Sequence, residues 1–368
     1  MAADSPGNSR TGNHRGLVNV LVARFSAFGD VAMTVPVLYS VCRCYPDVRF
    51  VFVTRPSMIG IFVNPPANLV LVGADVRDTY KGVAGLRRLV ATLIRDYEID
   101  AFVDLHNVLR TRVMSFFARL SGIHTYRIVK PRSKRRALTR RRNKVMLPLT
   151  SQRARYREAF FHAGLPVSDR FAGLYDGHGA APAALFSAIA DASARPCGER
   201  WIGIAPFAAH KGKIYPPELM EQVVARLTAS ETPVRVFLFG GGAAEKEILD
   251  GWAGCYDNVV SLAGKKAGFA VELALINHLD VMLSMDSANM HLAAIAGTPT
   301  VSVWGATHPY CGFRGWRQSD SDCIQLPLSC RPCSVFGNKP CYRGDYLCLN
   351  AIKPELVVNK LMSIISEK

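Results

Sequence analysis

Three short segments of this sequence carry residues that could move a proton or hold a negatively charged group. Asp30 follows a glycine after an apolar run, Lys213 lies in a loop before a helix that starts with proline, and Asp286-Ser287-Ala288 stands where a strand gives way to a helix. The unpaired N–H groups and the dipole of a helix start favour an anion such as a diphosphate. If these segments meet, they bring a carboxylate, a cation and an anion site to one cleft.

Each of these residues also has an ordinary structural explanation. Asp30 could be a helix cap, a position where Asp is favoured, and Lys213 could be a solvated surface lysine. His291, one turn into the later helix, could add a hydrogen-bond donor to the anion site, or it could be a buried helix histidine bonded to a carbonyl. The residues taken singly do not decide between these alternatives, whereas their occurrence together favours a ligand cleft.

The elements that must position these residues alternate between short apolar runs and helical periodicity. In the first half we expect strands over 17–23, 48–54, 68–73 and 99–105, with helices over 30–45 and 86–97. In the second half we expect strands over 201–205, 234–239, 281–285 and 300–304, with helices over 217–229, 243–253, 269–277 and 287–296. Repeated strand and helix units of this length predict parallel sheets covered by helices on both faces.

The chain is long enough for two domains. Its 368 residues exceed what one compact core usually holds, and the periodic pattern dissolves into Gly, Ala and Pro over 176–196. We therefore predict an α/β protein with two Rossmann-like, doubly wound domains, residues 16–178 and 197–350, that face a cleft. Residues 351–368 are expected to form a helix that packs back on the first domain, and residues 1–15 a loose tail without a signal region.

The charge of the chain favours an anionic partner. Lys and Arg number 45 against 29 Asp and Glu, and the stretch 127–144 holds ten of the basic residues and no acid. Such a stretch can bind an anion or an anionic membrane surface, or it can be a solvated basic loop. Nucleic acid is disfavoured, because the stretch lacks interleaved aromatic residues and no helix-turn-helix or RNA-binding signature occurs. The apolar runs are too short to predict a membrane span.

Several motifs together resemble glycosyltransferase family 9, which includes the ADP-heptose lipopolysaccharide heptosyltransferases. They occur in the family's order between residues 17 and 357: Arg24-x4-Gly29-Asp30-x3-Thr34-x-Pro36, Lys213-x-Tyr215-Pro216, Asp286-Ser287-Ala288-x2-His291-Leu292-Ala293-Ala294, Gly297-Thr298-Pro299, Gly305-x-Thr307 and the late cysteines. The resemblance implies a GT-B architecture, with an acceptor-binding first domain and a nucleotide-sugar-binding second domain. The chain departs from the family pattern at Tyr215, at Ala288 and in the bulky turn from Phe25 to Phe28.

The resemblance also implies a role for each site residue. Asp30 would be the general base for the acceptor hydroxyl, and Lys213 would neutralise the departing diphosphate. Ser287 and the N–H groups of its helix start would hold the donor nucleotide. The other donor-binding residues would be Asp286, Ala288, His291 and Glu245. The acceptor would contact Arg110 and Arg112 at the cleft side of the first domain.

The family resemblance implies transfer of heptose from ADP-heptose to the Kdo/heptose inner core of lipopolysaccharide, with inversion and without a required cofactor or metal. The acceptor would be an anionic, lipid-linked glycan, so the enzyme would work in the cytoplasm, at the inner face of the inner membrane. The alternative is a transferase of the same fold that uses another nucleotide sugar in surface-glycan assembly, because sugar choice depends on contacts outside the shared phosphate site. A member without catalysis would lack the base, whereas Asp30 and Lys213 are both present.

Four of the ten cysteines are clustered late in the chain, at Cys330, Cys333, Cys341 and Cys348. In a cytoplasmic protein such residues are free thiols or metal ligands rather than disulfides. Their spacing is compatible with a tetrahedral structural zinc. It is not the repeated C-x2-C of a zinc ribbon, so free thiols packed near the end of the domain are the alternative.

Overall fold

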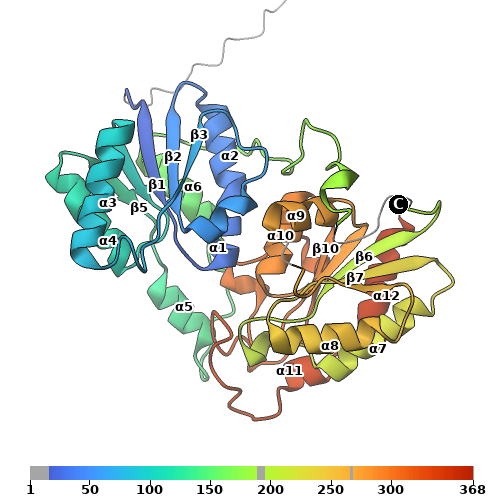
Figure 1. Ribbon diagram of the computed structural model, residues 1–368. Coiled ribbons are helices and arrows are strands. Elements are labelled where there is room, and N and C mark those ends of the chain that lie inside the picture. The colour runs from blue at the N-terminus through green and yellow to red at the C-terminus, as the bar shows by residue number, and fades with distance from the viewer. Residues whose placement is uncertain (1–15, 189–194, 266–267, 368) are drawn as a thin grey trace, which may run out of the picture.

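The computed structural model describes residues 16–188, 195–265 and 268–367, which form two α/β domains, each built on a parallel sheet (Figure 1). The predicted α/β fold with two sheets is confirmed. The tail predicted over 1–15 lies outside the described residues. In the described ranges, no helix is both long and apolar enough to cross a bilayer.

The first sheet has the strand order β3-β2-β1-β4-β5, with every pairing parallel. Its strands are β1 (Asn19–Ala23), β2 (Arg49–Thr54), β3 (Leu69–Gly73), β4 (Ala101–Asp104) and β5 (His124–Arg127). Strand β1 is entirely buried, and its Leu21 lies between Val51 and Phe102 of the neighbouring strands. Because the strands are parallel, their carboxyl ends share one edge of the sheet, and β1 leads there into the turn that carries Asp30.

The helices of the first domain are α1 (Phe28–Ala32), α2 (Val35–Cys44), α3 (Gly82–Tyr97), α4 (Leu109–Leu120), α5 (Arg132–Thr139) and α6 (Gln152–His162), with a 3-10 helix over Pro56–Ile61. The single helix predicted over 30–45 is wrong, because Met33 and Thr34 separate α1 from α2. Pro36 explains the break: inside a continuous helix its ring would clash with the carbonyl four residues earlier, whereas the first turn of a new helix tolerates it. Helix α5 lies inside the basic stretch 127–144, so that stretch is not simply a loop.

The second sheet has the order β11-β10-β9-β6-β7-β8, again with parallel pairings. Its strands are β6 (Arg200–Ala205), β7 (Val234–Leu238), β8 (Val259–Ser261), β9 (Val281–Met285), β10 (Thr300–Val303) and β11 (Cys323–Ile324). Its helices are α7 (Pro217–Thr228), α8 (Ala243–Ala253), α9 (Phe269–Asn277), α10 (Ala288–Ala296), α11 (Leu347–Asn350) and α12 (Pro354–Ser366). Because β6 and β9 are paired neighbours, the segments that follow them place Lys213 and Asp286 at the same edge.

The last helix, α12, packs against α7 and β9 of the second domain. Its buried side chains Val357, Leu361 and Ile365 belong to the apolar cluster of the second sheet, and Lys360 pairs with Asp322 at 2.9 Å. The expectation that this helix packs back on the first domain is therefore wrong. The spacing of four residues between its buried side chains makes a single apolar stripe, which the second domain alone covers well.

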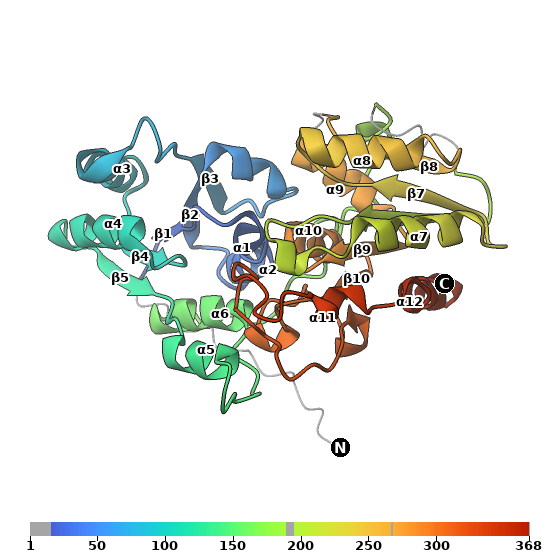
Figure 2. The same ribbon diagram turned by 90° about the horizontal axis from the view of Figure 1, so that it is seen from below.

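A continuous apolar core joins the two domains. One cluster of buried side chains extends from β1 and β2 to α9 and α10, and helix α1 packs on α10 (Figure 2). Gly29 allows this close approach, because a Cβ at that position would lie 2.9 Å from Cδ2 of His291. The relative position of the two sheets is therefore set by core packing, and so is the geometry of the space between them.

Candidate active site

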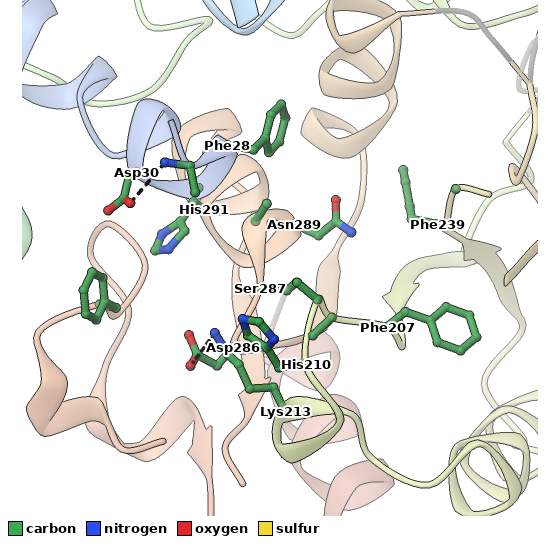
Figure 3. Close-up of a pocket in the computed structure, with 18 of the residues that line it drawn as sticks. Phe28, Asp30, Phe207, His210, Lys213, Phe239, Asp286, Ser287, Asn289 and His291 are labelled. Carbon is green, nitrogen blue, oxygen red and sulfur yellow. Dashed lines mark hydrogen bonds and ion pairs between the residues drawn. The ribbon is translucent and has the colours of Figure 1, made fainter. Parts of the chain in front are cut away.

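A cavity of about 550 Å³ lies between the two domains, within the size range of small-molecule sites. The start of α1 forms one side, and the loop after β6 with the start of α10 forms the other (Figure 3). The cavity brings together seven residues that the sequence predicted for the site: Asp30, Lys213, Glu245, Asp286, Ser287, Ala288 and His291. The predicted acceptor residues Arg110 and Arg112 are not among the described residues that line it.

Asp30 lies in the first turn of α1 with a side chain that is 19% exposed. Its Oδ2 accepts a hydrogen bond from the backbone N–H of Ala27 at 3.3 Å and pairs with Nη2 of Arg24 at 2.6 Å. The capping role that the sequence allowed is therefore present. Both contacts use Oδ2, however, so Oδ1 of this carboxylate can face a hydroxyl group in the cavity.

Arg24 fixes the position of Asp30 through the ion pair between them. Its buried guanidinium also donates from Nη1 to the carbonyl oxygen of Leu105 at 2.6 Å and lies 5.8 Å from the ring centroid of Tyr156. The Tyr156 hydroxyl donates in turn to the carbonyl oxygen of Asp30 at 3.1 Å. One arginine thus ties the Asp30 turn to the end of β4 and to α6. Arg24 belongs to the first family motif, but the sequence alone indicated no role for it.

Lys213 is a partly buried cation rather than a solvated surface residue. Its side chain is 16% exposed, and its Nζ lies 2.9 Å from Oδ2 of Asp286, which also accepts a hydrogen bond from Oγ1 of Thr307 at 2.7 Å. Gly337 makes room for this arrangement, because a Cβ there would lie 2.5 Å from Cγ of Lys213. Asp286 therefore orients Lys213. Direct contact of Asp286 with an anionic donor is unfavourable, since like charges repel.

The start of α10 supplies backbone donors to the cavity. Ser287 is its N-cap residue, with extended backbone and no capping hydrogen bond from its side chain, and its Oγ lies 3.1 Å from Oγ of Ser284. The N–H groups of the first helical turn have no partner within the helix. Because Ser287, Ala288 and Asn289 all line the cavity, these N–H groups and the helix dipole form a site suited to phosphate.

His291 is buried in its helix, as one of the two sequence alternatives expected, but its Nδ1 contacts no carbonyl within the described structure. It is buried and packs on Gly29, yet it also lines the cavity. Burial, with the nearby charges of Arg153 and Lys213, lowers the pKa of His291 to about 3, so the ring is neutral at neutral pH. Its Nδ1 has no hydrogen-bond partner within the described structure, which leaves a neutral imidazole able to donate or accept.

Two carboxylates and an aromatic pair line the part of the cavity next to α8 and α9. Oε2 of Glu245 accepts a hydrogen bond from the N–H of Gly241 at 2.8 Å. Glu272, which the sequence analysis missed, also lines the cavity, and burial raises its pKa. The rings of Phe28 and Phe269 lie 4.6 Å apart across the two domains. Carboxylate acceptors beside aromatic rings suit the ribose and base of a nucleoside.

Four cations lie near enough to Asp30 for their charges to interact with its carboxylate, and none of them is among the described residues that line the cavity: Arg24, Lys130, Arg135 and Arg155. Burial and neighbouring cations lower the pKa of Lys130 to about 8 and that of Arg155 to about 10. Nε of Arg135 and both Nη atoms of Arg155 are buried and have no hydrogen-bond partner in the described structure. The guanidinium of Arg135 lies over the ring of Phe336, which lines the cavity, at 5.5 Å.

The predicted acceptor residues Arg110 and Arg112 lie on α4. Arg112 is exposed, and its Nε donates to Oδ1 of Asn107 at 3.0 Å. Arg110 is close enough to His106 to lower the pKa of that imidazole, after burial and the charges of other cations. His106 in turn contacts Oγ of Ser26 at 3.3 Å. Arg110 therefore lies near the loop whose His106 contacts the turn that precedes Asp30, and neither arginine is among the described residues that line the cavity.

The four late cysteines, Cys330, Cys333, Cys341 and Cys348, are free thiols that line one small pocket. Among the residues that the structure describes, no group of three or more His, Cys, Asp or Glu side chains could hold a metal ion. Burial raises the pKa of Cys348 to about 11, which keeps this thiol protonated at neutral pH.

The family model of glycosyltransferase family 9 (heptosyltransferase) matches residues 87–340, well over half of the chain. The matched region includes the cavity-lining residues of the second domain, whereas those of the first domain, residues 27–33, precede it. The chain belongs to glycosyltransferase family 9. The predicted family and the assignment as a transferase are therefore confirmed.

Two curated members of the heptosyltransferase group are similar to this family 9 chain over nearly its full length. Lipooligosaccharide heptosyltransferase 2 of Campylobacter jejuni is 21% identical and aligns with 92% of this chain and 95% of its own. Lipopolysaccharide heptosyltransferase 1 of Pseudomonas aeruginosa is 24% identical, with 95% of this chain and 98% of its own covered.

Solved structures of the family share the fold. A family 9 glycosyltransferase from Veillonella parvula superposes with a TM-score of 0.70 at 16% identity, covering 95% of this chain and 98% of its own. E. coli ADP-heptose lipopolysaccharide heptosyltransferase II gives a TM-score of 0.66 at 16% identity, with 95% and 99% covered. E. coli heptosyltransferase WaaC with ADP gives 0.63 at 16% identity, with 94% and 100% covered. The predicted GT-B architecture is confirmed.

The departures of this family 9 member from the usual pattern leave the framework of the site intact. Phe25 is buried in the core of the first sheet, so Phe28 is the aromatic residue of the bulky turn that lines the cavity. Tyr215 is also buried, and its hydroxyl donates to the carbonyl oxygen of Ile352 at 2.7 Å, which supports the loop that carries Lys213. Ala288 keeps a small side chain at the anion site, as the sequence predicted.

Proposed function

We propose that this chain transfers heptose from ADP-heptose to the Kdo/heptose inner core of lipopolysaccharide and inverts the anomeric centre. Support comes from relatives named as heptosyltransferases that align over nearly the whole chain, and from WaaC structures of the same fold solved with ADP and with ADP-2-deoxy-2-fluoro heptose. One observation carries the proposal: a carboxylate of the first domain shares a cavity with a lysine and a helix start of the second.

In the proposed reaction, the acceptor hydroxyl oxygen attacks the anomeric carbon of heptose while the bond from that carbon to the diphosphate oxygen breaks. Oδ1 of Asp30 accepts the hydroxyl proton, and the electrons of the broken bond leave with the diphosphate. The acceptor approaches from the first domain and the diphosphate is held by the second. Attack from the side opposite the leaving group inverts the anomeric centre, and the fixed cleft holds both reactants in this orientation.

The departing ADP gains negative charge, and the second domain supplies the compensation. The ammonium of Lys213 and the N–H groups at the start of α10 would contact the diphosphate, with the hydroxyl of Ser287 as a further donor. Asp286 keeps Lys213 in place. Because these groups can stabilise the leaving group, we propose that the reaction needs no metal ion. Transfer that proceeds undiminished after treatment with EDTA would support this, and loss restored by a divalent cation would contradict it.

The acceptor side is proposed to bind an anionic sugar. A buried guanidinium without a hydrogen-bond partner is costly, and Arg135 and Arg155 both have such nitrogens close to Asp30. An acceptor carboxylate would satisfy these donors and place its hydroxyl near Asp30. Arg110 and Arg112, which also lie outside the cavity lining, would then meet outer parts of the glycan.

The nucleoside is proposed to be adenosine, bound beside Glu245, Glu272 and the Phe28–Phe269 pair. The alternative is another nucleotide sugar used in surface-glycan assembly by a transferase of the same fold. Calorimetric titration of the protein with ADP, UDP and GDP separates the two. Preference for ADP that is lost in Lys213→Ala supports the heptosyltransferase proposal, whereas preference for UDP or GDP keeps the mechanism and changes the sugar.

We also propose that the enzyme works in the cytoplasm, at the inner face of the inner membrane. The acceptor of the proposed reaction is lipid-linked, and the basic stretch 127–144 suits an anionic membrane surface. Much of this stretch is solvent-exposed, including Arg132, Lys134 and Arg136 on α5. Cell fractionation that recovers the protein with inner membranes at low salt, and in the soluble fraction at high salt, would support peripheral attachment.

A further inference from the structure

The excess positive charge of the chain is confined to one continuous segment. Residues 105–157, which we call the basic segment, hold sixteen Lys and Arg residues and no Asp or Glu. The net charge of the whole chain is +16, so the remainder of the sequence is balanced. The segment forms β5, helices α4 and α5 and the first part of α6, all in the first domain. The positive field of the protein therefore originates from the first domain alone.

The same segment exposes many apolar side chains. Fourteen large apolar side chains are exposed in the described residues, and half of them lie in this small part of the chain: Leu109, Phe116, Leu120, Val129, Val145, Met146 and Leu147. Scattered exposed apolar residues are normal on protein surfaces, but a concentration of them marks an interaction site. Charge and apolar exposure therefore coincide on one part of the molecule.

Helix α4 arranges three of these side chains in a line. Leu109 is 80% exposed, Phe116 55% and Leu120 69%, and their spacing of seven and four residues places them along one face of the helix. We call these three residues the α4 ridge. The opposite face, which includes Met114 and Ala118, is buried in the core of the first sheet. The ridge is therefore a second apolar face, about 16 Å long at 1.5 Å per residue.

Exposed arginines flank the α4 ridge. Arg112 and Arg119 lie three residues after Leu109 and Phe116, to one side of the ridge, and both are exposed. A helix with an apolar stripe and flanking cations can lie in the plane of a membrane interface, with its apolar side chains between headgroups and acyl chains. Both α4 and α3 lie on the flank of the first domain that faces away from the second domain (Figures 1 and 2).

The positive charge around the α4 ridge indicates which kind of partner can bind there. A second copy of the chain would bring two uncompensated basic segments together, which like-charge repulsion opposes. Single-stranded nucleic acid would satisfy the charge, but the ridge presents two leucines and a single phenylalanine where the stacking of successive bases needs several aromatic platforms. A bilayer with anionic phospholipids satisfies both features, because phosphates attract the arginines and acyl chains accept the leucines.

We infer that the α4 ridge and the exposed cations of the basic segment dock this chain on a bilayer rich in anionic phospholipids. The ridge begins at Leu109, next to the edge of the sheet where His106 contacts Ser26 in the turn that precedes Asp30. Val129 and Lys130 follow β5, the strand next to β4. Nζ of Lys130 donates to the carbonyl oxygen of Asn107 at 2.8 Å, which joins the loop after β5 to the loop after β4. If the proposed function is right, docking brings the cleft close to the membrane-embedded acceptor.

Flotation of the full chain with lipid vesicles tests this inference. The vesicles contain either phosphatidylglycerol with phosphatidylethanolamine or phosphatidylcholine alone, and the variant carries Leu109→Ser, Phe116→Ser and Leu120→Ser together. The matched control carries Val18→Ser, Leu185→Ser and Leu356→Ser, which are exposed apolar residues elsewhere on the molecule. Because all six side chains are exposed, both variants should fold, as circular dichroism and thermal unfolding can verify.

The wild type and the control should bind phosphatidylglycerol vesicles equally, and the ridge variant at least tenfold more weakly. High salt should weaken binding of the wild type but leave an apolar remainder that the ridge variant lacks. Equal binding by the ridge variant and the wild type would overturn the inference, and so would equal binding to phosphatidylcholine. A change from dimer to monomer in the ridge variant, seen by light scattering, would instead assign the face to a second copy of the chain.

These measurements do not depend on the sugar that the enzyme transfers. A second assay links docking to the proposed function: with an acceptor embedded in vesicles, the ridge variant should transfer more slowly, whereas with a deacylated, water-soluble acceptor it should match the wild type. Normal flotation without transfer to either acceptor would refute the proposed substrate and leave the docking face in place. Equal transfer to both acceptors by the wild type and the ridge variant would show that docking does not serve this reaction.

Discussion

The two sides of the cavity differ in how their charged groups are paired. On the second-domain wall, the cation is already paired: Lys213 contacts Asp286, which also accepts a hydrogen bond from Thr307. On the first-domain side, the carboxylate of Asp30 interacts with four cations that lie outside the cavity lining, and buried nitrogens of two of them, Arg135 and Arg155, have no hydrogen-bond partner in the described structure.

This difference indicates which substrate each wall binds. The second-domain wall, which we call the donor wall, uses backbone N–H groups and one oriented lysine. This arrangement can hold any nucleoside diphosphate with little rearrangement. The first-domain side, meaning Asp30 and the four cations near it, is what we call the acceptor wall. Its partly buried cations outnumber its carboxylate, which is favourable only with an anionic partner. Substitutions on the two walls should therefore act on different kinetic constants.

The largest effect is expected from Asp30→Asn. The amide keeps an oxygen that can contact Arg24 and the N–H of Ala27, but it cannot accept the hydroxyl proton. Loss of a general base typically costs a factor of about 10² to 10⁴, so kcat should fall by about that much while the Kd for ADP stays unchanged. Single-turnover kinetics and calorimetry measure the two quantities.

Asp30→Ala is the less informative variant, because it also leaves the buried guanidinium of Arg24 without its carboxylate. Its thermal unfolding should therefore occur at a lower temperature than that of Asp30→Asn. If Asp30→Asn weakened ADP binding as much as it slowed transfer, Asp30 would belong to the donor wall and the assignment as base would be lost.

A smaller but still large effect is expected from Lys213→Ala. Removing a charge-assisted contact to the diphosphate should weaken ADP binding by about 10- to 100-fold, and turnover should fall with it. The measurement is calorimetry with ADP, and Lys211→Ala is the control, because Lys211 is exposed two residues away and its ammonium lies near the ring of Tyr346.

A double substitution tests whether Asp286 only orients Lys213 or also contacts the donor. Lys213→Ala leaves the carboxylate of Asp286 facing the diphosphate without its cation, so Lys213→Ala/Asp286→Asn should bind ADP better than Lys213→Ala alone. Weaker binding by the double variant would show that Asp286 contacts the donor directly and is more than a support for Lys213.

The donor wall was also the part that the sequence predicted well. Its residues follow buried apolar strands and precede helices with clear periodicity, so Lys213 and Ser287 could be placed at one sheet edge. The acceptor wall was harder, because β5 (HTYR) is a polar edge strand and α5 lies within a run of like charges. No local pattern marks Arg135 as partly buried and its neighbour Arg136 as exposed, since that depends on packing against Phe336 of the second domain.

Glu272 could have been found from the sequence by a local signal, whereas the position of the last helix could not. Glu272 is the single charged residue of the apolar helix α9 (FAVELALIN), and a lone carboxylate there suggests a functional role. The apolar stripe of α12 shows that one face is buried, but it does not say against which domain. Tertiary packing alone decides this.

On the acceptor wall, Arg135→Ala should raise the acceptor KM by about tenfold and change kcat and donor binding much less, because it removes one charge-assisted contact. The control is Arg136→Ala on the same helix, whose side chain is exposed. Initial rates at varied acceptor and fixed donor measure the effect. An equal rise in KM for both variants would mean that the basic segment attracts the acceptor by its overall field, without a defined contact at Arg135.

The smallest effect concerns pH and Lys130. Burial and the charges of Arg24 and Arg135 lower the pKa of Lys130 to about 8, so its ammonium is charged at pH 7 and mostly neutral at pH 9. If this charge helps to bind the acceptor, the acceptor KM should rise a few-fold as the pH increases through 8, while the KM for the donor stays nearly constant. Rates measured at both substrates between pH 7 and pH 9 test this.

Lys130→Arg isolates the cause, because a guanidinium keeps its charge over this whole range. The variant should therefore show a flat acceptor KM where the wild type shows a rise. The hydrogen bond from Nζ to the carbonyl oxygen of Asn107 does not confuse the result in the wild type, since a neutral amine can still donate it. Parallel pH profiles for the two proteins would assign the titration to another group and would weaken the view that unpaired cations define the acceptor wall.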